Sequence, residues 1–350
     1  MDAAVLFVWG MTALLSMSLA TPIGKRNDTS VRPSIVEINL QAGLLGNPNC
    51  GEMPACDKVC RFGYEKSQDG CPICSCIPDD KNILIEGDMM STPAVRARLF
   101  GPGSRGSTAF GNLWPGGVVP YVIDSSLASE GLATQAITAG MNEWTSQTCV
   151  SFVPKTVQTN YVKFYKGEGC WSYIGVVGGE QLVSLDTGCW YTGTVAHEIG
   201  HALGYFHEHS RPDRDDYVTI QWDNVLSGTE FRRQFDKYDE SYIDSLGTTY
   251  DYGSVMHYPR DAFSSNGQPT IVPSQNGVTL GNTEGISEMD ARQMNLLYGC
   301  SPPGESTTPA ATTSASSCMD KNERRCDRWK SFCPFSGKMQ KHCRQTCGLC

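Results

Sequence analysis

Hydrophobic and polar positions divide the chain into stretches of different character. Residues 1–20 are almost entirely apolar and end in Ser-Leu-Ala, so small residues stand where a signal peptidase cuts. The run is short for a membrane span and no basic stop-transfer flank follows it, which favours a signal peptide over a membrane anchor. Residues 106–300 have the patterning of an ordinary globular core. Residues 301–317 lack large apolar side chains and are mostly Ser, Thr, Pro and Ala, which predicts an extended linker.

The stretch TVAHEIGHALGYFHEHSRP, residues 194–212, has the spacing of a helix followed by a turn. His197 and His201 are four residues apart, so on a helix their imidazoles lie on one face, one turn apart. Gly204 follows where the helix must end, because glycine tolerates the left-handed conformation that reverses the chain. We therefore expect a helix that carries the first two histidines and a turn that returns His207 to them.

Three histidines in this arrangement predict a zinc site. Three neutral imidazoles leave the fourth position of a tetrahedral ion open for water, which is typical of catalytic rather than structural zinc. A bare HExxH also arises by chance on a surface helix, but HExxHxxGxxH fixes two further residues. Glu198 lies beside the first histidine. In SVMHYP, residues 254–259, Met256 is expected to form a turn beneath the metal and Tyr258 to reach it.

Sixteen cysteines indicate small modules on either side of the core region. Six lie within residues 50–76 and six within 318–350, and each block is too short to form a core without disulfide bonds. The other four, consistent with two bridges, are Cys149, Cys170, Cys189 and Cys300. Disulfides persist in oxidising compartments, so we expect a secreted, extracellular protein. The net charge of −9 offers no broad basic surface and argues against nucleic-acid binding.

Residues 106–300 resemble the astacins, a family of metzincin metalloproteases. The segments that carry the resemblance are LWPGGVVPYVID, GCWSYIG, GGEQLVSLDTGCWYTGTVAHEIGHALGYFHEHSRPDRDDYV, DYGSVMHY and DARQMNLLYGC. Glu208 after the third histidine and Tyr258 after the methionine turn are typical of astacins among metzincins. The resemblance implies an α/β (α+β) two-lobed catalytic domain with one zinc ion. It also implies the disulfide pairs Cys149–Cys300 and Cys170–Cys189.

The activity that the resemblance implies is hydrolysis of peptide bonds in protein or peptide substrates. Glu198 would take a proton from the attacking water and pass it to the leaving amine, and the Tyr258 hydroxyl would stabilise the oxyanion. A competing class is a binding protein in which this domain is only a spacer. The intact set of His197, His201, His207, Glu198 and Tyr258 favours the enzyme.

Residues 21–105 are interpreted as a propeptide that keeps the enzyme latent. The sequence ILIEGDMM, residues 83–90, resembles the astacin pro-segment signature, in which an aspartate replaces the catalytic water on zinc. Asp88 is the matching residue, although the family usually has an aromatic where Ile85 stands. The alternative is that Asp88 only forms a turn with Gly87.

Activation of such a zymogen requires a cut before the mature domain. Arg105 is the nearest basic residue and Arg98 is the other candidate. By resemblance, the new amino terminus approaches Glu208 and orders the mature site.

The block 50–76 resembles an antistasin-type module, a small inhibitor of serine proteases. Asp57 follows Cys56 where a trypsin-type inhibitor would present a basic residue. We therefore expect a disulfide staple or recognition module rather than an inhibitor. A zinc finger is excluded by the oxidising compartment.

The block 318–350 resembles a ShK toxin-type (ShKT) domain through its CxxTCxxC ending. The implied pairs are Cys318–Cys350, Cys326–Cys343 and Cys333–Cys347. Eight basic and three acidic residues give it a net charge of +5, which predicts docking to an acidic surface or matrix partner. Gln340 and Lys341 follow Met339 where channel blockers have a Lys-Tyr pair, so channel block is not favoured. Such tails are frequent in cnidarian and nematode astacins, so storage in venom capsules (nematocysts), with a toxin or binding role, is a competing hypothesis.

Overall fold

The structure is a computed structural model that describes Ile35, Asn39 and residues 64–69, 71–77, 81–100, 113–240 and 243–300. Several predictions fall outside these residues and stay predictions. They are the signal peptide at 1–20, the linker at 301–317, and the block 318–350 with its implied disulfides Cys318–Cys350, Cys326–Cys343 and Cys333–Cys347. The activation site expected at Arg105 and the side chain of Arg98, the other candidate, also lie outside the described residues.

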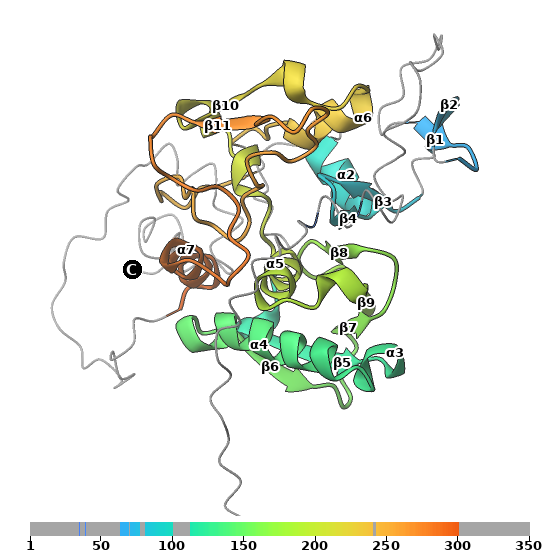
Figure 1. The fold of residues 1–350 in the computed structure, drawn as a ribbon. Coiled ribbons are helices and arrows are strands. Elements are labelled where there is room, and N and C mark those ends of the chain that lie inside the picture. The colour runs from blue at the N-terminus through green and yellow to red at the C-terminus, as the bar shows by residue number, and fades with distance from the viewer. Residues whose placement is uncertain are drawn as a thin grey trace, which may run out of the picture. The chain divides into compact units, whose positions relative to one another are not determined.

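A seven-stranded mixed sheet forms the first half of the fold (Figure 1). In spatial order its strands are β3 (Ile83–Ile85), β4 (Met89–Ser91), β8 (Cys170–Tyr173), β9 (Glu180–Leu185), β7 (Tyr161–Tyr165), β5 (Val118–Ile123) and β6 (Ser151–Pro154). The strands β9, β7, β5 and β6 run parallel to one another, whereas β8 runs antiparallel to β9. The two strands from the predicted propeptide, β3 and β4, extend the sheet beyond β8.

Strand β7 illustrates why these segments are strands. Its sequence YVKFY alternates, so Val162 and Phe164 are buried while Lys163 between them keeps its ammonium near Asp124 at the surface. Successive side chains of a strand point to opposite faces, so this pattern buries one face and leaves the other solvated.

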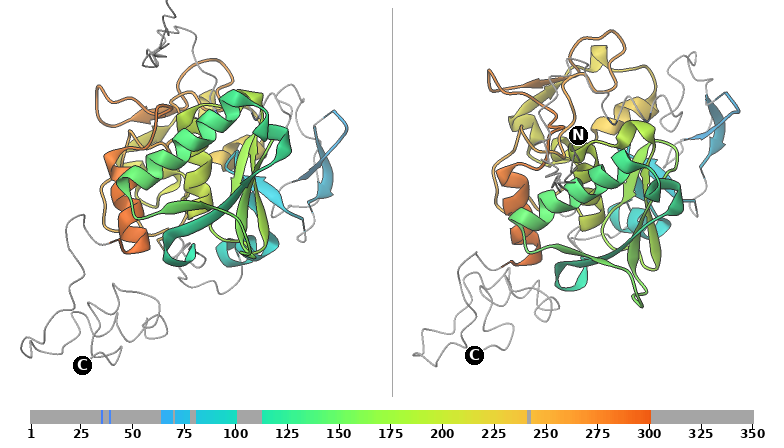
Figure 2. Two further views of the ribbon diagram at one scale, coloured as in Figure 1. Left: turned by 90° about the horizontal axis from the view of Figure 1, so that it is seen from below. Right: turned by 60° about the horizontal axis from the view of Figure 1, so that its bottom comes forward.

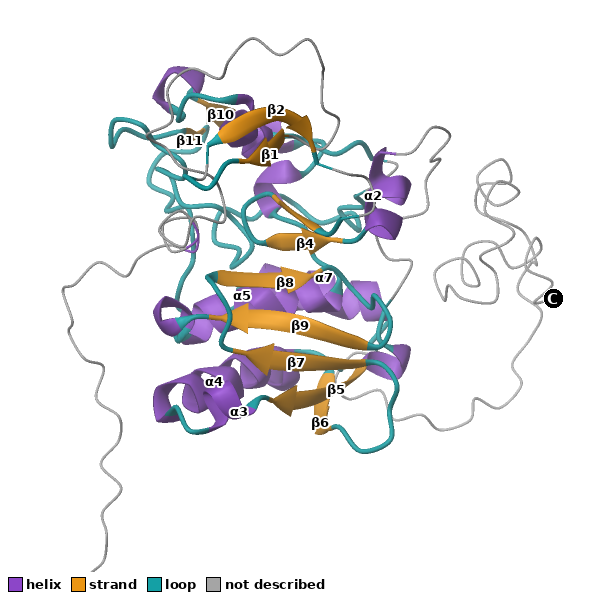
Figure 3. Ribbon diagram, turned by 90° about the vertical axis from the view of Figure 1, so that its right-hand side faces the viewer, coloured by secondary structure: helices purple, strands orange, loops and turns teal. Residues whose placement is uncertain are grey.

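Helices α3 (Ser125–Ala128) and α4 (Gly131–Gln147) lie between β5 and β6 in the chain, and α5 (Thr192–Leu203) comes after β9. Figures 2 and 3 show α4 and α5 on the same face of the sheet. The two helices pack closely because Gly140 of α4 has no side chain: a Cβ there would lie 2.9 Å from the Val195 Cγ1 of α5. The Trp144 indole N–H of α4 also donates to the Ala196 carbonyl of α5, at 2.9 Å. The sheet and α4 thereby fix the position of α5.

The chain after Gly204 forms a second, more irregular half around its own hydrophobic cluster, which includes Phe231, Phe235, Phe263 and Ile271. Its longer elements are β10 (Val218–Ile220), α6 (Thr229–Arg232) and β11 (Ile271–Pro273). Helix α7 (Glu288–Tyr298) follows them and packs through Ala291 and Met294 in the cluster of the first half. The remaining described elements are β1 (Tyr64–Lys66), β2 (Pro72–Cys76), α2 (Pro93–Phe100) and six short 3₁₀ turns at Pro115–Gly117, Thr187–Cys189, Glu208–Ser210, Arg214–Asp216, Trp222–Asn224 and Arg233–Phe235. The expected mixed α/β class is confirmed.

Disulfide bonds join Cys149 to Cys300 and Cys170 to Cys189, the pairs that the resemblance implies. The first ties the end of α4 to the end of α7 across 151 residues. In the block 50–76, the described residues Cys71, Cys74 and Cys76 are also disulfide-bonded. No helix among the described ranges is both long and apolar enough to cross a membrane.

Candidate metal centre

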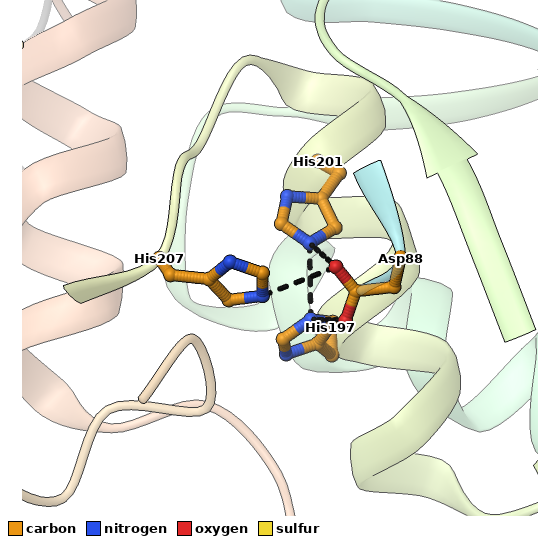
Figure 4. Close-up of side chains that lie close together, drawn as sticks. All are labelled: Asp88, His197, His201 and His207. Atoms are coloured by element: carbon orange, nitrogen blue, oxygen red, sulfur yellow. Dashed lines mark hydrogen bonds and ion pairs between the residues drawn. The ribbon is translucent and has the colours of Figure 1, made fainter. Parts of the chain in front are cut away.

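Four buried side chains from three separate segments meet beside α5. His197 and His201 come from α5, His207 from the segment after it, and Asp88 from the turn between β3 and β4 (Figure 4). One ligand-type atom of each residue lies within 4.8 Å of all the others. The structure therefore brings together the three predicted metal ligands and the predicted pro-segment aspartate.

The local geometry of this meeting follows from Gly204. Helix α5 ends at Leu203, and Gly204 adopts φ of 114°, a conformation that L side chains rarely take. Its N–H donates to carbonyls of the last helical turn, and the Tyr205 N–H donates to the Gly200 carbonyl at 2.9 Å. This reversal carries His207 back to the helix face that holds the other two histidines.

Each histidine donates a hydrogen bond from Nδ1 and keeps Nε2 for the centre. The Nδ1–H of His197 donates to the Val255 carbonyl at 2.7 Å, and that of His201 to the Tyr205 carbonyl at 2.8 Å. The Nδ1–H of His207 donates to the Glu86 carboxylate at 2.8 Å. Because these oxygens accept, each ring carries a proton on Nδ1 and directs its Nε2 toward the other rings. The Nε2 atoms of His197 and His201 are 3.0 Å apart.

The Asp88 carboxylate closes the fourth side of the cluster. Its Oδ2 lies 3.2 Å from the His197 Nε2, and its Oδ1 lies 3.3 and 3.2 Å from the Nε2 atoms of His201 and His207. Burial alone would raise the pKa of Asp88, but the charge of His207 and the close approach of the three rings hold it well below its usual value. Asp88 therefore stands as a carboxylate among the three histidines, and the turn with Gly87 is what presents it there.

The donor set fits a zinc ion. Three imidazole nitrogens and one carboxylate oxygen are ligands that tetrahedral zinc prefers. The His207 Nε2 and the Asp88 Oδ1 are buried without a well-formed hydrogen bond, as expected of atoms that face a metal. Burial lowers the pKa of His207, yet Asp88 and Glu86 beside it raise it to about 9. A divalent cation would compensate the negative charge of these buried carboxylates.

Glu198 and Tyr258 lie next to the cluster. Both carboxylate oxygens of Glu198 are buried without a hydrogen-bond partner, and burial together with Asp88 raises its pKa well above the usual value. The Tyr258 hydroxyl donates to the Glu86 carbonyl at 2.5 Å. The Tyr258 ring stacks on His209 with centroids 3.9 Å apart and lies 4.7 Å from the His207 ring.

Met256 lies beneath α5, where a Cβ on Gly200 would be 2.7 Å from its Sδ. The Met256 carbonyl accepts a hydrogen bond from the Glu208 N–H at 3.0 Å. The Glu208 carboxylate accepts from the Arg211 guanidinium at 2.9 Å and from the Asp251 N–H at 2.8 Å. Burial raises the pKa of Glu208 to about 7, although Arg211 opposes the shift. A cavity of about 40 Å³ lies beside this carboxylate, and the new amino terminus expected there lies outside the described residues.

Three residues with roles at this centre are absent from the predicted site: sequence reasoning missed Glu86 and Asp290, and left out His257 although it is adjacent to Tyr258. Glu86 binds His207 and Tyr258, as described above. Asp290 in α7 accepts from the Ser254 hydroxyl at 2.6 Å and from the Val255 N–H at 2.9 Å, so it anchors the segment that holds His197. His257 accepts from the Tyr250 hydroxyl at 2.6 Å and donates to the Tyr258 carbonyl at 2.7 Å. For Glu86 the available signal was its place two residues before Asp88 in ILIEGDMM.

A cavity of about 60 Å³ lies beside His197. The start of α5, the segment at Pro259 and the segment 281–283 line it, together with Ile35 from the predicted propeptide. Asp88 and His197 of the candidate metal centre also line this cavity.

Three family models match separate parts of the chain. The model of the astacin peptidase family matches residues 107–299, the antistasin family model matches 50–76, and the ShK domain-like model matches 317–350. All three resemblances are thereby confirmed.

Two curated relatives of the chain are named zinc metalloproteinases. Zinc metalloproteinase nas-15 of Caenorhabditis elegans is 45% identical over 242 residues, which are 65% of this chain and 42% of that protein. Zinc metalloproteinase nas-6 of the same organism is 34% identical over 259 residues, 68% of this chain and 74% of that protein. The chain spans about two fifths of the length of the first curated relatives it matches.

A solved structure also matches the chain: high choriolytic enzyme 1, a hatching enzyme zinc-protease from Oryzias latipes. It is 38% identical, covers 54% of this chain and 94% of its own, and has a TM-score of 0.49. The astacin model covers more than half of the 350 residues, including all three histidines of the centre. The chain belongs to the astacin family of zinc metalloproteases.

Proposed function

We propose that the chain is a secreted zinc endopeptidase that hydrolyses peptide bonds of extracellular proteins and is made as a latent zymogen. The observation that carries this proposal is the convergence of the His197, His201 and His207 Nε2 atoms beside the unpartnered Glu198 carboxylate. A purely structural metal site would have no use for a second, unpartnered acid at its edge. The family match supports the same activity.

The three histidines would hold the zinc ion, which supplies a Lewis acid for the peptide carbonyl. Glu198 takes a proton from the attacking water and passes it to the leaving amine, a role that needs a carboxylate without a fixed partner. Tyr258 donates its hydroxyl to the oxyanion once the propeptide releases it from the Glu86 carbonyl. Met256 supports α5 from below, and Glu208 with Arg211 anchors the segment after His207.

Latency is proposed to arise from residues 21–105, with Asp88 in the position that the catalytic water needs. Strands β3 and β4 support this role because they pair with each other and, through β4, with β8 beside the centre, and so hold the Asp88 turn in place. The proposed division of the chain is a signal peptide at 1–20, a propeptide at 21–105, a catalytic domain at 106–300, a linker at 301–317 and a ShKT domain at 318–350.

The ShKT domain is proposed as a targeting module. Its net charge of +5 in a chain of −9 supports docking to an acidic surface or matrix partner. A toxin or binding role, with storage in nematocysts, is the alternative; the complete set of catalytic side chains supports the peptidase.

The test compares Glu198→Ala with the wild-type chain after removal of the propeptide. The variant keeps all three imidazoles, so we expect it to bind one zinc ion and to lose protein cleavage by at least about 10²–10⁴-fold. Wild-type cleavage should also stop when a chelator removes the metal. Near wild-type turnover by Glu198→Ala would refute the proposed function.

A further inference from the structure

Two carboxylates from one short turn lie on either side of the His207 ring. Strands β3 and β4 pair as far as Ile85 and Met89, which leaves Glu86, Gly87 and Asp88 as the turn between them. Asp88 lies on the Nε2 side of His207, and Glu86 bonds to its Nδ1. The ring is therefore held from both sides by the same segment of the propeptide.

Glu86 is held firmly in this position. Its φ is 45°, in the left-handed region that costs energy for a residue with a side chain. Its side chain is 1% exposed and also makes a hydrogen bond with Tyr238. Its carbonyl accepts the Tyr258 hydroxyl. A buried acid with a strained backbone and this many partners indicates a specific role rather than that of an ordinary turn residue.

The Nδ1 partners of the three histidines differ in one respect. His197 and His201 donate to the carbonyls of Val255 and Tyr205, which belong to the catalytic domain and stay with it. His207 donates to Glu86, which leaves with the propeptide. In metal sites, the acceptor of the second ring N–H fixes the ring orientation and raises the basicity of the metal-binding nitrogen.

We propose that Glu86 is a metal-positioning residue of the propeptide, which orients His207 so that the latent protein holds zinc more tightly than Asp88 and the three histidines alone would. The inference rests on the proposed function, because it requires His207 to be a zinc ligand. The turn then has two roles. Asp88 excludes water from the metal position, and Glu86 raises the zinc affinity by holding the His207 Nδ1, the ring nitrogen that does not face the metal.

The experiment measures the zinc dissociation constant of the uncleaved full chain by competition with a chromophoric chelator. Glu86→Ala removes the acceptor, and Glu86→Gln keeps the shape and an amide oxygen but loses the charge. Both keep a Cβ at the strained position, so neither changes the backbone cost. Glu168→Gln, the same chemical change at an exposed position, is the matched control.

We expect Glu86→Ala to raise the zinc dissociation constant by roughly 10–100-fold, the usual effect of losing such a partner, with a smaller rise in Glu86→Gln. Glu168→Gln should match the wild type. The ratios of zinc dissociation constants should be the same when all variants also carry Asp88→Asn. This background shows that the Glu86 effect does not arise from displacement of the Asp88 carboxylate. The unfolding midpoints of the metal-free proteins serve as the readout of fold stability.

Equal zinc constants for the wild type and both Glu86 variants would overturn the inference. So would a lower unfolding midpoint of the metal-free variants with an unchanged zinc constant, because Glu86 would then serve only to dock the propeptide. If Glu86→Ala does not fold, Glu86→Gln decides the question. Failure of the wild-type chain to bind one zinc ion would instead reject the proposed function itself.

Discussion

Gly193→Ala is expected to destabilise the chain by forcing apart α5 and the segment that faces it. Gly193 is the second residue of α5, and a Cβ there would lie 2.1 Å from the Thr283 carbonyl oxygen and 2.3 Å from its carbon. An ordinary contact needs roughly 3.5 Å, so the 283 segment must move by more than about 1 Å. The obstacle is backbone and cannot change rotamer, so the cost should be near the upper end of overpacking, about 3 kcal/mol.

The assay is thermal unfolding of the uncleaved chain, followed by circular dichroism. For a domain of this size, a loss of about 3 kcal/mol lowers Tm by roughly 6–12 °C. Gly131→Ala is the matched control, because Gly131 begins α4 and a Cβ there meets nothing within 4 Å. Its stability should change by less than about 1 kcal/mol. A Gly193→Ala variant with the Tm of the wild type, or an equal loss in Gly131→Ala, would show that the close approach of Thr283 to α5 does not limit stability.

Two further predictions concern Tyr258 and His257. After propeptide removal, Tyr258→Phe should lower kcat by roughly 10²–10³-fold with little change in KM, because the hydroxyl acts only in the transition state; a pure KM effect in steady-state assays would contradict this. Burial, aided by His207, lowers the pKa of His257 to about 4, below its unfolded value of about 6.5. The unfolded chain therefore takes up this proton first, and stability falls by roughly 3 kcal/mol as pH drops from about 6.5 to about 4. In urea unfolding at several pH values, His257→Gln should lose that part of the slope, and an unchanged slope would refute it.

The zinc helix could be predicted from sequence because its signals are local. Histidines four apart share a helix face, and Gly204 marks the end of the helix whatever the rest of the chain does. The pairing of Cys149 with Cys300 came only from the family resemblance, since spacing alone left the connectivity open.

The residues that sequence reasoning missed act over long separations. Glu86 bonds to a histidine 121 residues away, and Asp290 anchors Ser254 from 36 residues away. No local pattern reports such contacts. Strands β3 and β4 are three residues each, too short to show the alternation of a strand, and they exist because β8 offers an edge for pairing. Only the fold could reveal that two strands of the proposed propeptide extend the sheet that carries β8.

In the function proposed here, Asp88 itself, rather than the bulk of the propeptide, keeps the enzyme latent. The most direct test measures the peptidase activity of two uncleaved proteins: Asp88→Ala, and a chain that lacks the disulfide-rich residues 50–76. We predict that Asp88→Ala cleaves a protein substrate without processing, because water can then reach the position that the carboxylate fills. The deletion variant should show no peptidase activity. If the uncleaved deletion variant cleaves the substrate and uncleaved Asp88→Ala does not, the aspartate does not keep the enzyme latent, and the propeptide blocks the site sterically.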